Sequence, residues 1–367
     1  MVEPLVLHPE HERLGAELRD VDGWTVPVRY GDVSAEHAAV RGGVGVIDRS
    51  ERGKLEATGS DRAAFLHGML SNDIRALVPG QGCRSALLDV HGKVTALLAV
   101  HCLPDRLVLE TERARVATVL ATLDHYLFSE RVELEDVSAA WGLLTVAGPV
   151  ARRTIETALG IAVPALAPRQ HVLVERDGMP WRVVGGAETG EAEEYDVWIP
   201  TQGLAPAWAR LRQAGATPVG RAAWEILRVE AGVVRAGVDV DPGMLLLEAP
   251  LEDAYSLSKG CYLGQEVVAR VTYRGHVNRR LVGIRLEGAR VPPAGAPIVA
   301  EGREIGRITS AVLSPAVGRA LGFGVVRHEH AAPGTRVDVR VGDDRLPAEV
   351  SALPFHATAA GTPATAR

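Results

Sequence analysis

Apolar residues recur along the chain at two spacings, and each spacing predicts one kind of element. After Ser60 they fall three and four residues apart at Phe65, Leu66, Met69 and Leu70, a spacing typical of one face of a helix. Between 85 and 110 they alternate in three runs, and a His-Gly-Lys tripeptide at 91–93 separates the first two, which predicts a hairpin and then a third strand. A second helix is predicted over 112–128. This order of elements is typical of an α+β layer with an antiparallel sheet.

The same patterns continue to the end of the chain. Strands are predicted over 171–175, 181–184 and 195–200, and helices over 149–158, 203–214 and 221–231, the last one ending at Gly232. Beyond 276, short alternating runs recur between prolines and glycines, which is typical of a small β-barrel or sandwich. Residues 1–22 are polar and predict a surface lead-in, whereas residues 353–367 predict a disordered tail.

Composition and charge narrow the class of protein. The 367 residues are 47% hydrophobic and 23% charged, a globular composition large enough for two or three sub-domains. A net charge of −6 and an aromatic share of 4% argue against direct nucleic-acid binding. The three cysteines, Cys83, Cys102 and Cys261, predict neither a disulfide framework nor a zinc site. Because no signal-peptide pattern or apolar run of about 18 residues is present, we expect a cytoplasmic protein without a membrane partner.

Two histidine pairs are weak candidates for metal binding. His8 and His11 lie in the polar lead-in, and His328 and His330 would share one face of a strand if a strand formed there. Neither pair has an evident third ligand, so no metal site is expected.

The most unusual chemistry lies in one octet, Lys259-Gly260-Cys261-Tyr262-Leu263-Gly264-Gln265-Glu266. Its glycines permit positive φ or a close approach to a ligand. Cys261 supplies a thiol whose pKa a nearby Lys259 would lower, while Gln265 and Glu266 supply amide and carboxylate groups. Taken singly, a cysteine is more often a small buried hydrophobe and two glycines a turn. The octet as a unit is far more specific and favours a functional site.

The octet resembles the signature of the YgfZ-like folate-binding proteins, which are relatives of the T-protein (aminomethyltransferase) of the glycine cleavage system. All positions except Leu263 fit, and the match continues through 267–270. Other segments of this chain also resemble T-protein motifs. They are the glycine-rich run at 41–50, Asn72-Asp73, Gly92 and the Leu-Arg-Val-Glu-Ala-Gly run at 227–232. The resemblance extends from about residue 41 to residue 350.

This resemblance implies an α+β, T-protein-like arrangement of three domains around a central folate channel, with a small C-terminal β-barrel. The expected divisions are a lead-in at 1–22, a folate-binding region of two interleaved sub-domains at 23–275, the barrel at 276–352 and the tail at 353–367.

The resemblance also implies a cofactor, tetrahydrofolate or a derivative. Asp196, in a strand that follows a Thr-Gly-Glu turn at 189–191, would accept N–H bonds from the pterin, with Glu194 as the spare candidate and a solvated acidic loop as the alternative. Arg228 would face the folate cavity. Cys261 and Lys259 are the candidate catalytic residues. The further candidates for folate contact are Asn72, Asp73, Tyr262, Gln265 and Glu266.

Two functions from different classes remain open. The first is a folate-dependent, non-metabolic accessory protein for assembly or repair of iron–sulfur clusters, which sustains cluster enzymes that modify tRNA and uses the Cys261 thiol. The alternative is a tetrahydrofolate-dependent aminomethyltransferase of the glycine cleavage system, acting with a lipoyl carrier. Ala96 and Leu97 stand where aminomethyltransferases have an acid pair, and this argues against the alternative because neither side chain can exchange a proton. A folate-using demethylase or oxidase module is disfavoured because no Rossmann fingerprint is present.

Overall fold

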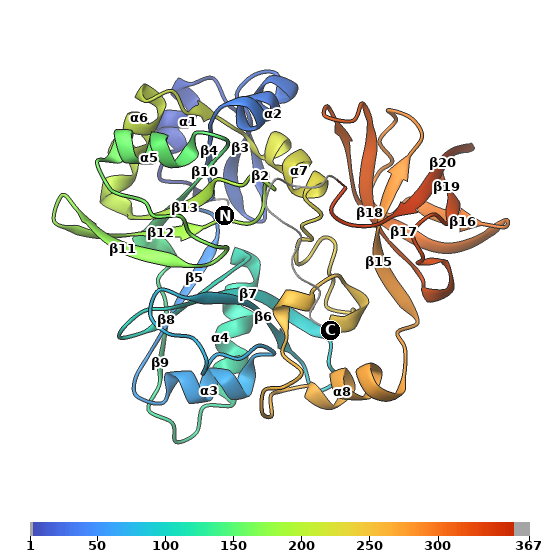
Figure 1. The fold of residues 1–367 in the computed structure, drawn as a ribbon, viewed down its shortest axis with the longest axis horizontal. Helices are drawn as coiled ribbons and strands as arrows, with labels where there is room; N and C mark the ends of the chain where they lie inside the picture. Colours follow the sequence, from blue (N-terminus) through green and yellow to red (C-terminus); the bar gives the residue numbers. More distant parts are fainter. Residues whose placement is uncertain (1–2, 356–367) are drawn as a thin grey trace.

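The computed structural model describes residues 3–355, which form two sheet-and-helix units and a barrel (Figure 1). The first unit is a six-stranded sheet, antiparallel except where β14 pairs with β4. Its helices bury Ile155, Leu204 and Trp208 in a core shared with the strands. Its strands in spatial order are β11 (His171–Arg176), β12 (Met179–Gly185), β13 (Glu194–Pro200), β10 (Trp141–Ala147), β4 (Gly45–Asp48) and β14 (Thr217–Pro218), and its helices are α2 (Val33–Gly42), α5 (Ala151–Leu159), α6 (Thr201–Gln213) and α7 (Arg221–Glu230).

The second unit is a five-stranded antiparallel sheet with two helices. Phe65 and Leu66 of one helix and Val119 and Leu123 of the other are buried with the strands in one core. The predicted helix, hairpin, strand and second helix are all present here. The strands in spatial order are β6 (Gly82–Leu88), β7 (Val94–Cys102), β8 (Leu107–Thr111), β5 (Gly53–Thr58) and β9 (Glu133–Asp136), and the helices are α3 (Arg62–Met69) and α4 (Val116–His125).

The C-terminal unit is a closed barrel, as the short alternating runs predict. Inward-facing aliphatic side chains such as Ile284, Val326 and Val339 are fully buried in it. Its strands in spatial order are β15 (Arg279–Leu286), β18 (Arg319–Arg327), β17 (Arg303–Ser314), β16 (Pro297–Ala300), β19 (Arg336–Val341) and β20 (Asp344–Ser351).

The segment between α7 and the barrel is long and largely irregular, and it ends in helix α8 (Gln265–Arg274). In Figure 1 it runs beside the second unit before it enters the barrel. Short 3-10 turns occur at η1 (Arg113–Arg115), η2 (Ser138–Ala140), η3 (Leu246–Glu248), η4 (Glu252–Ala254) and η5 (His328–His330). His328 and His330 thus lie in a turn and not on a strand.

The first residues differ from the expected lead-in because they form β1 (Glu3–Pro4), α1 (His8–Arg13) and β2 (Glu17–Val21), with β3 (Trp24–Arg29) completing a three-stranded sheet. His11 is fully buried. Its Nε2 lies 3.0 Å from an Asp48 carboxylate oxygen, and its Nδ1 lies 2.8 Å from the Tyr30 hydroxyl. These polar contacts anchor a segment that has no strong apolar pattern.

The chain end differs in part from the expected tail. Phe355 is buried, its backbone N–H donates to the Glu230 carbonyl at 3.2 Å, and its ring lies 6.2 Å from that of Phe323. The rest of the predicted tail, 356–367, lies outside the described residues. Within residues 3–355, no helix combines the length and apolar character that a membrane crossing needs.

Candidate functional site

The two sheets are joined where the chain crosses from β4 to β5, and this crossing carries buried charges. Arg52 is 9% exposed, and its guanidinium binds Glu110 in β8 at 2.7 Å and Glu112, directly after that strand, at 2.6 Å. Lys54 is fully buried and donates to the carbonyls of Ser50 and Arg52 at 3.0 and 2.9 Å. Burial lowers the pKa of Lys54 to about 8, although Glu110 opposes this shift.

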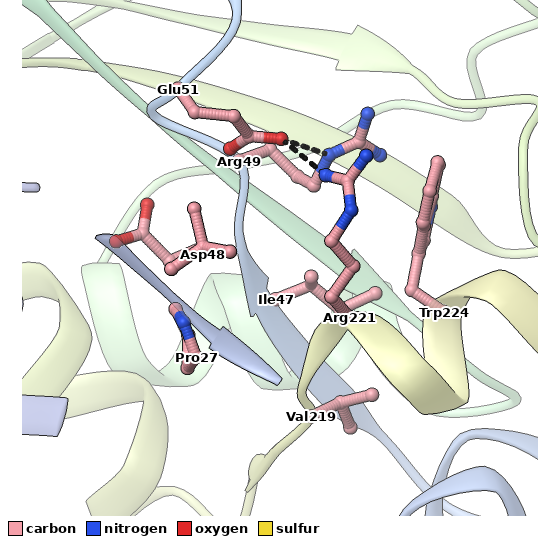
Figure 2. A pocket seen from close by; sticks show the side chains of 9 residues that line it. Pro27, Ile47, Asp48, Arg49, Glu51, Val219, Arg221 and Trp224 are labelled. Carbon is pink, nitrogen blue, oxygen red and sulfur yellow. Dashed lines mark hydrogen bonds and ion pairs between the residues drawn. The ribbon is translucent and has the colours of Figure 1, made fainter. Parts of the chain in front are cut away.

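A second arginine of the crossing, Arg49, pairs with an acid of the six-stranded sheet. Arg49 binds Glu188, in the loop between β12 and β13, at 2.7 Å, and it also lies 3.3 Å from Glu51. Burial disfavours a charged Glu188, but the attraction of the nearby arginines outweighs it and lowers the pKa of Glu188 to about 2. Arg221, at the start of α7, binds the same Glu51 at 3.2 Å. Figure 2 shows both guanidinium groups against Glu51, with the Trp224 ring to one side of a small pocket.

Asp196, the predicted pterin acceptor, lies on β13 and faces this charged region. Its Oδ1 accepts a hydrogen bond of 2.5 Å from the Thr145 hydroxyl on the neighbouring strand β10, and no other protein hydrogen bond to its carboxyl is found in residues 3–355. Burial, together with the negative charges of Glu110, Glu194 and Glu188, raises the pKa of Asp196 well above its usual range. The carboxyl therefore has an oxygen available for a ligand. We name Arg49, Glu51, Arg52, Glu110, Glu112, Glu188 and Asp196 the inter-sheet cluster.

Glu194, the spare candidate, is occupied by its own loop. Its carboxylate accepts hydrogen bonds from the backbone N–H groups of Glu188 and Thr189, both at 2.8 Å, and from the Thr189 hydroxyl at 2.7 Å. It therefore shapes the loop between β12 and β13, and Asp196 is the better acceptor for a ligand.

The ion pairs of the inter-sheet cluster were missed from the sequence. The available signal was the run of charges at 49–52, between two strands and followed by a fully buried Lys54. Their partners lie 58 and 139 residues away along the chain, so only the fold brings them together.

Ala96 and Leu97, which stand in place of the acid pair of aminomethyltransferases, are packed in the protein interior. Ala96 and Leu97 on β7 belong to two different hydrophobic clusters, and they are 0% and 8% exposed. On the adjacent strand β8, Glu110 pairs with Ala99, two residues beyond Leu97.

Lys259 of the octet caps a helix, and its hydrogen bonds go to backbone carbonyls and not to the Cys261 thiol. Its Nζ donates to the carbonyls of His67, Leu70 and Asn72, at 2.5 to 2.9 Å, where α3 ends. These carbonyls have no partner within the helix, and a lysine ammonium is a suitable donor for them. Nζ also lies 4.8 Å from the centroid of the Tyr262 ring.

The rest of the octet packs against the turn of the hairpin β6–β7. Gly264 has φ +79°, and a Cβ there would lie 2.4 Å from the Asp89 carbonyl oxygen in the hairpin turn. Gln265 accepts a hydrogen bond of 3.2 Å from the Tyr262 backbone N–H at the start of α8. Burial raises the pKa of the Tyr262 phenol to about 12. Glu266 is exposed on α8. Lys259, Gly264 and Gln265 of the octet therefore have a structural explanation.

Cys261 is exposed, and no hydrogen bond to its thiol is present in the described part of the chain. We expect Cys261→Ser to change the free energy of unfolding by no more than about 0.5 kcal/mol, because surface substitutions without contacts are usually this mild. Ellman's reagent should modify one thiol of the native wild type quickly and two slowly, since Cys83 and Cys102 are partly buried. The fast phase should be absent in Cys261→Ser. A fast phase that persists in the variant would contradict this assignment.

Asn72 and Asp73 support the same region. The Asn72 amide donates to the carbonyls of Arg84 and Asp253 at 2.7 and 2.9 Å. Asp73 accepts from the Ala76 backbone N–H at 3.1 Å and lies 3.2 Å from the His67 ring. Their polar groups are used within the protein and hold the segment that follows α3.

Arg228, expected in the folate cavity, is fully buried and its guanidinium is satisfied by the protein. Nε and Nη2 bind Glu225, Nη1 donates to the Val233 carbonyl at 2.9 Å and to Asp239 at 2.8 Å, and Nη2 donates to the Ser310 hydroxyl at 2.8 Å. These contacts use all five N–H groups of an arginine. The expected cavity role therefore has no support in this bonding, and Arg228 instead ties α7 to β17 of the barrel.

Comparison with known proteins places the whole chain in one family. The GCVT N-terminal domain matches residues 7–259, and the glycine cleavage T-protein C-terminal barrel domain matches residues 279–356. A protein of Rubrobacter xylanophilus named aminomethyltransferase is 33% identical over 352 residues, which cover 95% of this chain and 93% of that protein. A protein of the same name from Cutibacterium acnes is 33% identical over 359 residues, covering 94% and 96%.

A solved structure shows the same fold. The crystal structure of glycine cleavage system aminomethyltransferase T from Bartonella henselae matches with a TM-score of 0.91 over 98% of this chain and 99% of that one, at 24% identity. This confirms the expected T-protein fold with its C-terminal barrel.

The comparisons correct the first of the two functions expected from the sequence. These relatives are named aminomethyltransferase, so they contradict an accessory protein for iron–sulfur clusters and favour the alternative. The YgfZ-like specificity, the iron–sulfur partners and the link to tRNA modification are likewise without support. The chain belongs to the glycine cleavage T-protein family.

Proposed function

We propose that this chain is a tetrahydrofolate-dependent aminomethyltransferase that binds the pterin of its cofactor at Asp196. The observation that carries the proposal is the half-buried carboxyl of Asp196, which has an oxygen available for a ligand within the inter-sheet cluster, in a chain of this family. Aminomethyltransferases of this family use tetrahydrofolate.

The chemistry of Asp196 suits this role. A carboxylate can accept two parallel N–H bonds from the 2-aminopyrimidinone edge of a pterin, and such charge-assisted pairs are stronger than neutral ones. Thr145 holds one oxygen by a hydrogen bond and so orients the carboxyl. The ion pairs of Arg49 and Arg52 keep the neighbouring acids charged, and this supports the raised pKa of Asp196.

The apolar residues at 96 and 97 restrict how a proton can be transferred. Since Ala96 and Leu97 cannot take part, a proton would have to come from water or from an acid of the inter-sheet cluster. The partner in this proposal is the lipoyl carrier protein of glycine cleavage, the H protein.

Replacement of Asp196 by Asn is expected to weaken binding of 5-formyltetrahydrofolate by roughly tenfold to a hundredfold, the effect of losing a charged hydrogen bond. Isothermal titration calorimetry measures this directly. The matched control is Glu193→Gln, three residues earlier, whose carboxylate instead pairs with Arg152 at 3.3 Å. An equal loss in both variants, or no binding by the wild type, would remove the folate site from the proposal.

Because the raised pKa of Asp196 favours its protonated form in the free protein, binding of two N–H donors should release a proton. Affinity for the cofactor should therefore rise with pH until the pKa of Asp196 is passed, and the slope should be lost in Asp196→Asn. Calorimetry in buffers of different ionisation enthalpy would count the released protons.

The transfer itself needs a separate assay. The wild type should form methylenetetrahydrofolate and ammonia from an aminomethylated lipoyl carrier and tetrahydrofolate. Folate binding without any such product would retain the folate site but reject aminomethyl transfer.

A further inference from the structure

A buried arginine lies between the two sheets with two of its nitrogen atoms unpaired in the described part of the chain. Arg182 on β12 is 2% exposed, and its guanidinium carbon lies 4.6 Å from the ring centroid of Trp198 and 5.8 Å from that of Trp141. Its Nε and Nη1 atoms are buried, and neither has a hydrogen-bond partner within residues 3–355. A buried cation without a counter-ion is costly, so such a group calls for an acceptor.

The acids that act on Arg182 through space are engaged elsewhere. Glu56 binds Arg106 at 2.6 Å, and Glu110 binds Arg52 at 2.7 Å. Burial lowers the pKa of Arg182 to about 10 against the opposing effect of these acids, so the guanidinium is still charged at neutral pH.

Other groups without partners surround the same tryptophan. The Trp198 indole N–H is fully buried and has no acceptor in the described part of the chain. The His101 ring lies 5.9 Å from that of Trp198 and 5.6 Å from that of His171. Within residues 3–355 no well-aligned hydrogen bond reaches the ring nitrogens of the two histidines, although backbone carbonyls of Arg169 and Cys102 lie close to them. Burial lowers the pKa of both histidines, that of His171 to about 4, so both are neutral and each carries one N–H.

We propose that a small monovalent anion such as chloride binds between the six-stranded and five-stranded sheets, against the Arg182 guanidinium and the Trp198 N–H. Arginine and tryptophan side chains only donate hydrogen bonds, so their partner must accept. A water molecule accepts but has to place its own protons on further acceptors. A halide accepts several N–H groups and also neutralises the guanidinium.

The site lies where apolar residues of both units meet. Trp198 and Val184 of the first unit are buried in one cluster with Leu103 and Val108 of the second. A bound anion therefore stabilises the docking of one sheet unit on the other. This inference does not depend on the proposed transferase activity.

Thermal unfolding of the full chain tests the site. We expect Tm in sodium bromide or chloride to exceed Tm in sodium gluconate at equal ionic strength and to rise with halide concentration as ligand linkage requires. Arg182→Met should weaken the halide affinity by roughly tenfold to a hundredfold. The matched control is Arg153→Met, an exposed arginine on α5, which should keep the wild-type response.

Crystals of the wild type soaked in bromide should show an anomalous peak within hydrogen-bonding distance of Arg182. If Arg182→Met does not fold, Trp198→Phe serves instead, because it keeps most of the ring and removes only the N–H; it should shift the halide dependence to higher concentration. Equal Tm values in halide and gluconate, or no bromide peak at Arg182, would overturn the proposal and assign the donors to buried water.

Discussion

Replacement of Arg228 by Met is expected to lower the free energy of unfolding by about 3–5 kcal/mol, the usual effect of removing one partner of a buried ion pair. Asp239 is fully buried, and its Oδ2 accepts a 2.8 Å hydrogen bond from Nη1 of Arg228, so the variant leaves this carboxylate without its cation. The Ser310 hydroxyl on β17 also loses its donor. Chemical denaturation followed by circular dichroism measures the change.

A double variant separates the ion pair from the loss of packing. Arg228→Met combined with Asp239→Asn should be less destabilised than the sum of the single variants, because no uncompensated charge remains. Arg303→Met, an exposed arginine on the same strand β17, should change stability by no more than about 0.5 kcal/mol. If Arg228→Met changed the free energy of unfolding as little as Arg303→Met, the contacts of Arg228 between α7 and the barrel would not contribute to stability.

Lys259→Met should destabilise the protein by about 2–3 kcal/mol, because a charged donor is lost and three carbonyls at the end of α3 are left without it. Hydrogen exchange should accelerate in the octet and in the turn of the hairpin β6–β7, with less effect in the barrel. Lys93→Met, an exposed lysine in that hairpin turn, is the control. Unchanged exchange in the octet would show that the cap is dispensable.

The pH dependence of Lys259→Met follows from the pKa of this lysine. Burial lowers it from 10.5 to about 8, so between these values the unfolded chain binds a proton that the folded chain does not. The contribution of Lys259 to the free energy of unfolding therefore rises with pH over this range. Lys54 has a similarly lowered pKa and is present in both proteins, so the difference between wild type and Lys259→Met isolates Lys259. A difference that stays constant from pH 8 to 10 would contradict the shift.

Much of the fold could be predicted from local patterns. Alternation over 85–100 and the glycine between the runs correspond to β6 and β7, because side chains of a strand point to opposite faces. Apolar spacing over 112–128 corresponds to α4, whose Val116, Val119 and Leu123 are buried. Gly232 does follow α7, with the φ of +76° that favours glycine after a helix.

The first segment shows where local patterns do not suffice. His11 looks like a surface residue in the sequence, but the fold buries it against Asp48 and Tyr30. A polar residue can be buried when distant partners satisfy it, and the sequence does not show which partners those are.

The candidate site was also predicted only in part from the sequence. Motifs resembling a known family identified the fold and tetrahydrofolate, because such motifs record chemistry that is local in sequence, and the role of Asp196 is a proposal built on the same resemblance. The function chosen first from the octet was wrong in the light of the relatives, and the octet's lysine and second glycine are explained by packing.

Periodicity and motifs are properties of neighbouring residues, so they were sufficient to predict the order of helices and strands, the barrel and the family. Which charges meet depends on how the sheets and helices pack. Arg49 binds Glu188, which lies 139 residues away in the sequence, and Lys259 binds the His67 carbonyl at the end of α3, which lies 192 residues away. Ion pairing and helix capping depend on distances of a few ångströms between segments far apart in the chain, and those distances exist only after the sheets have packed.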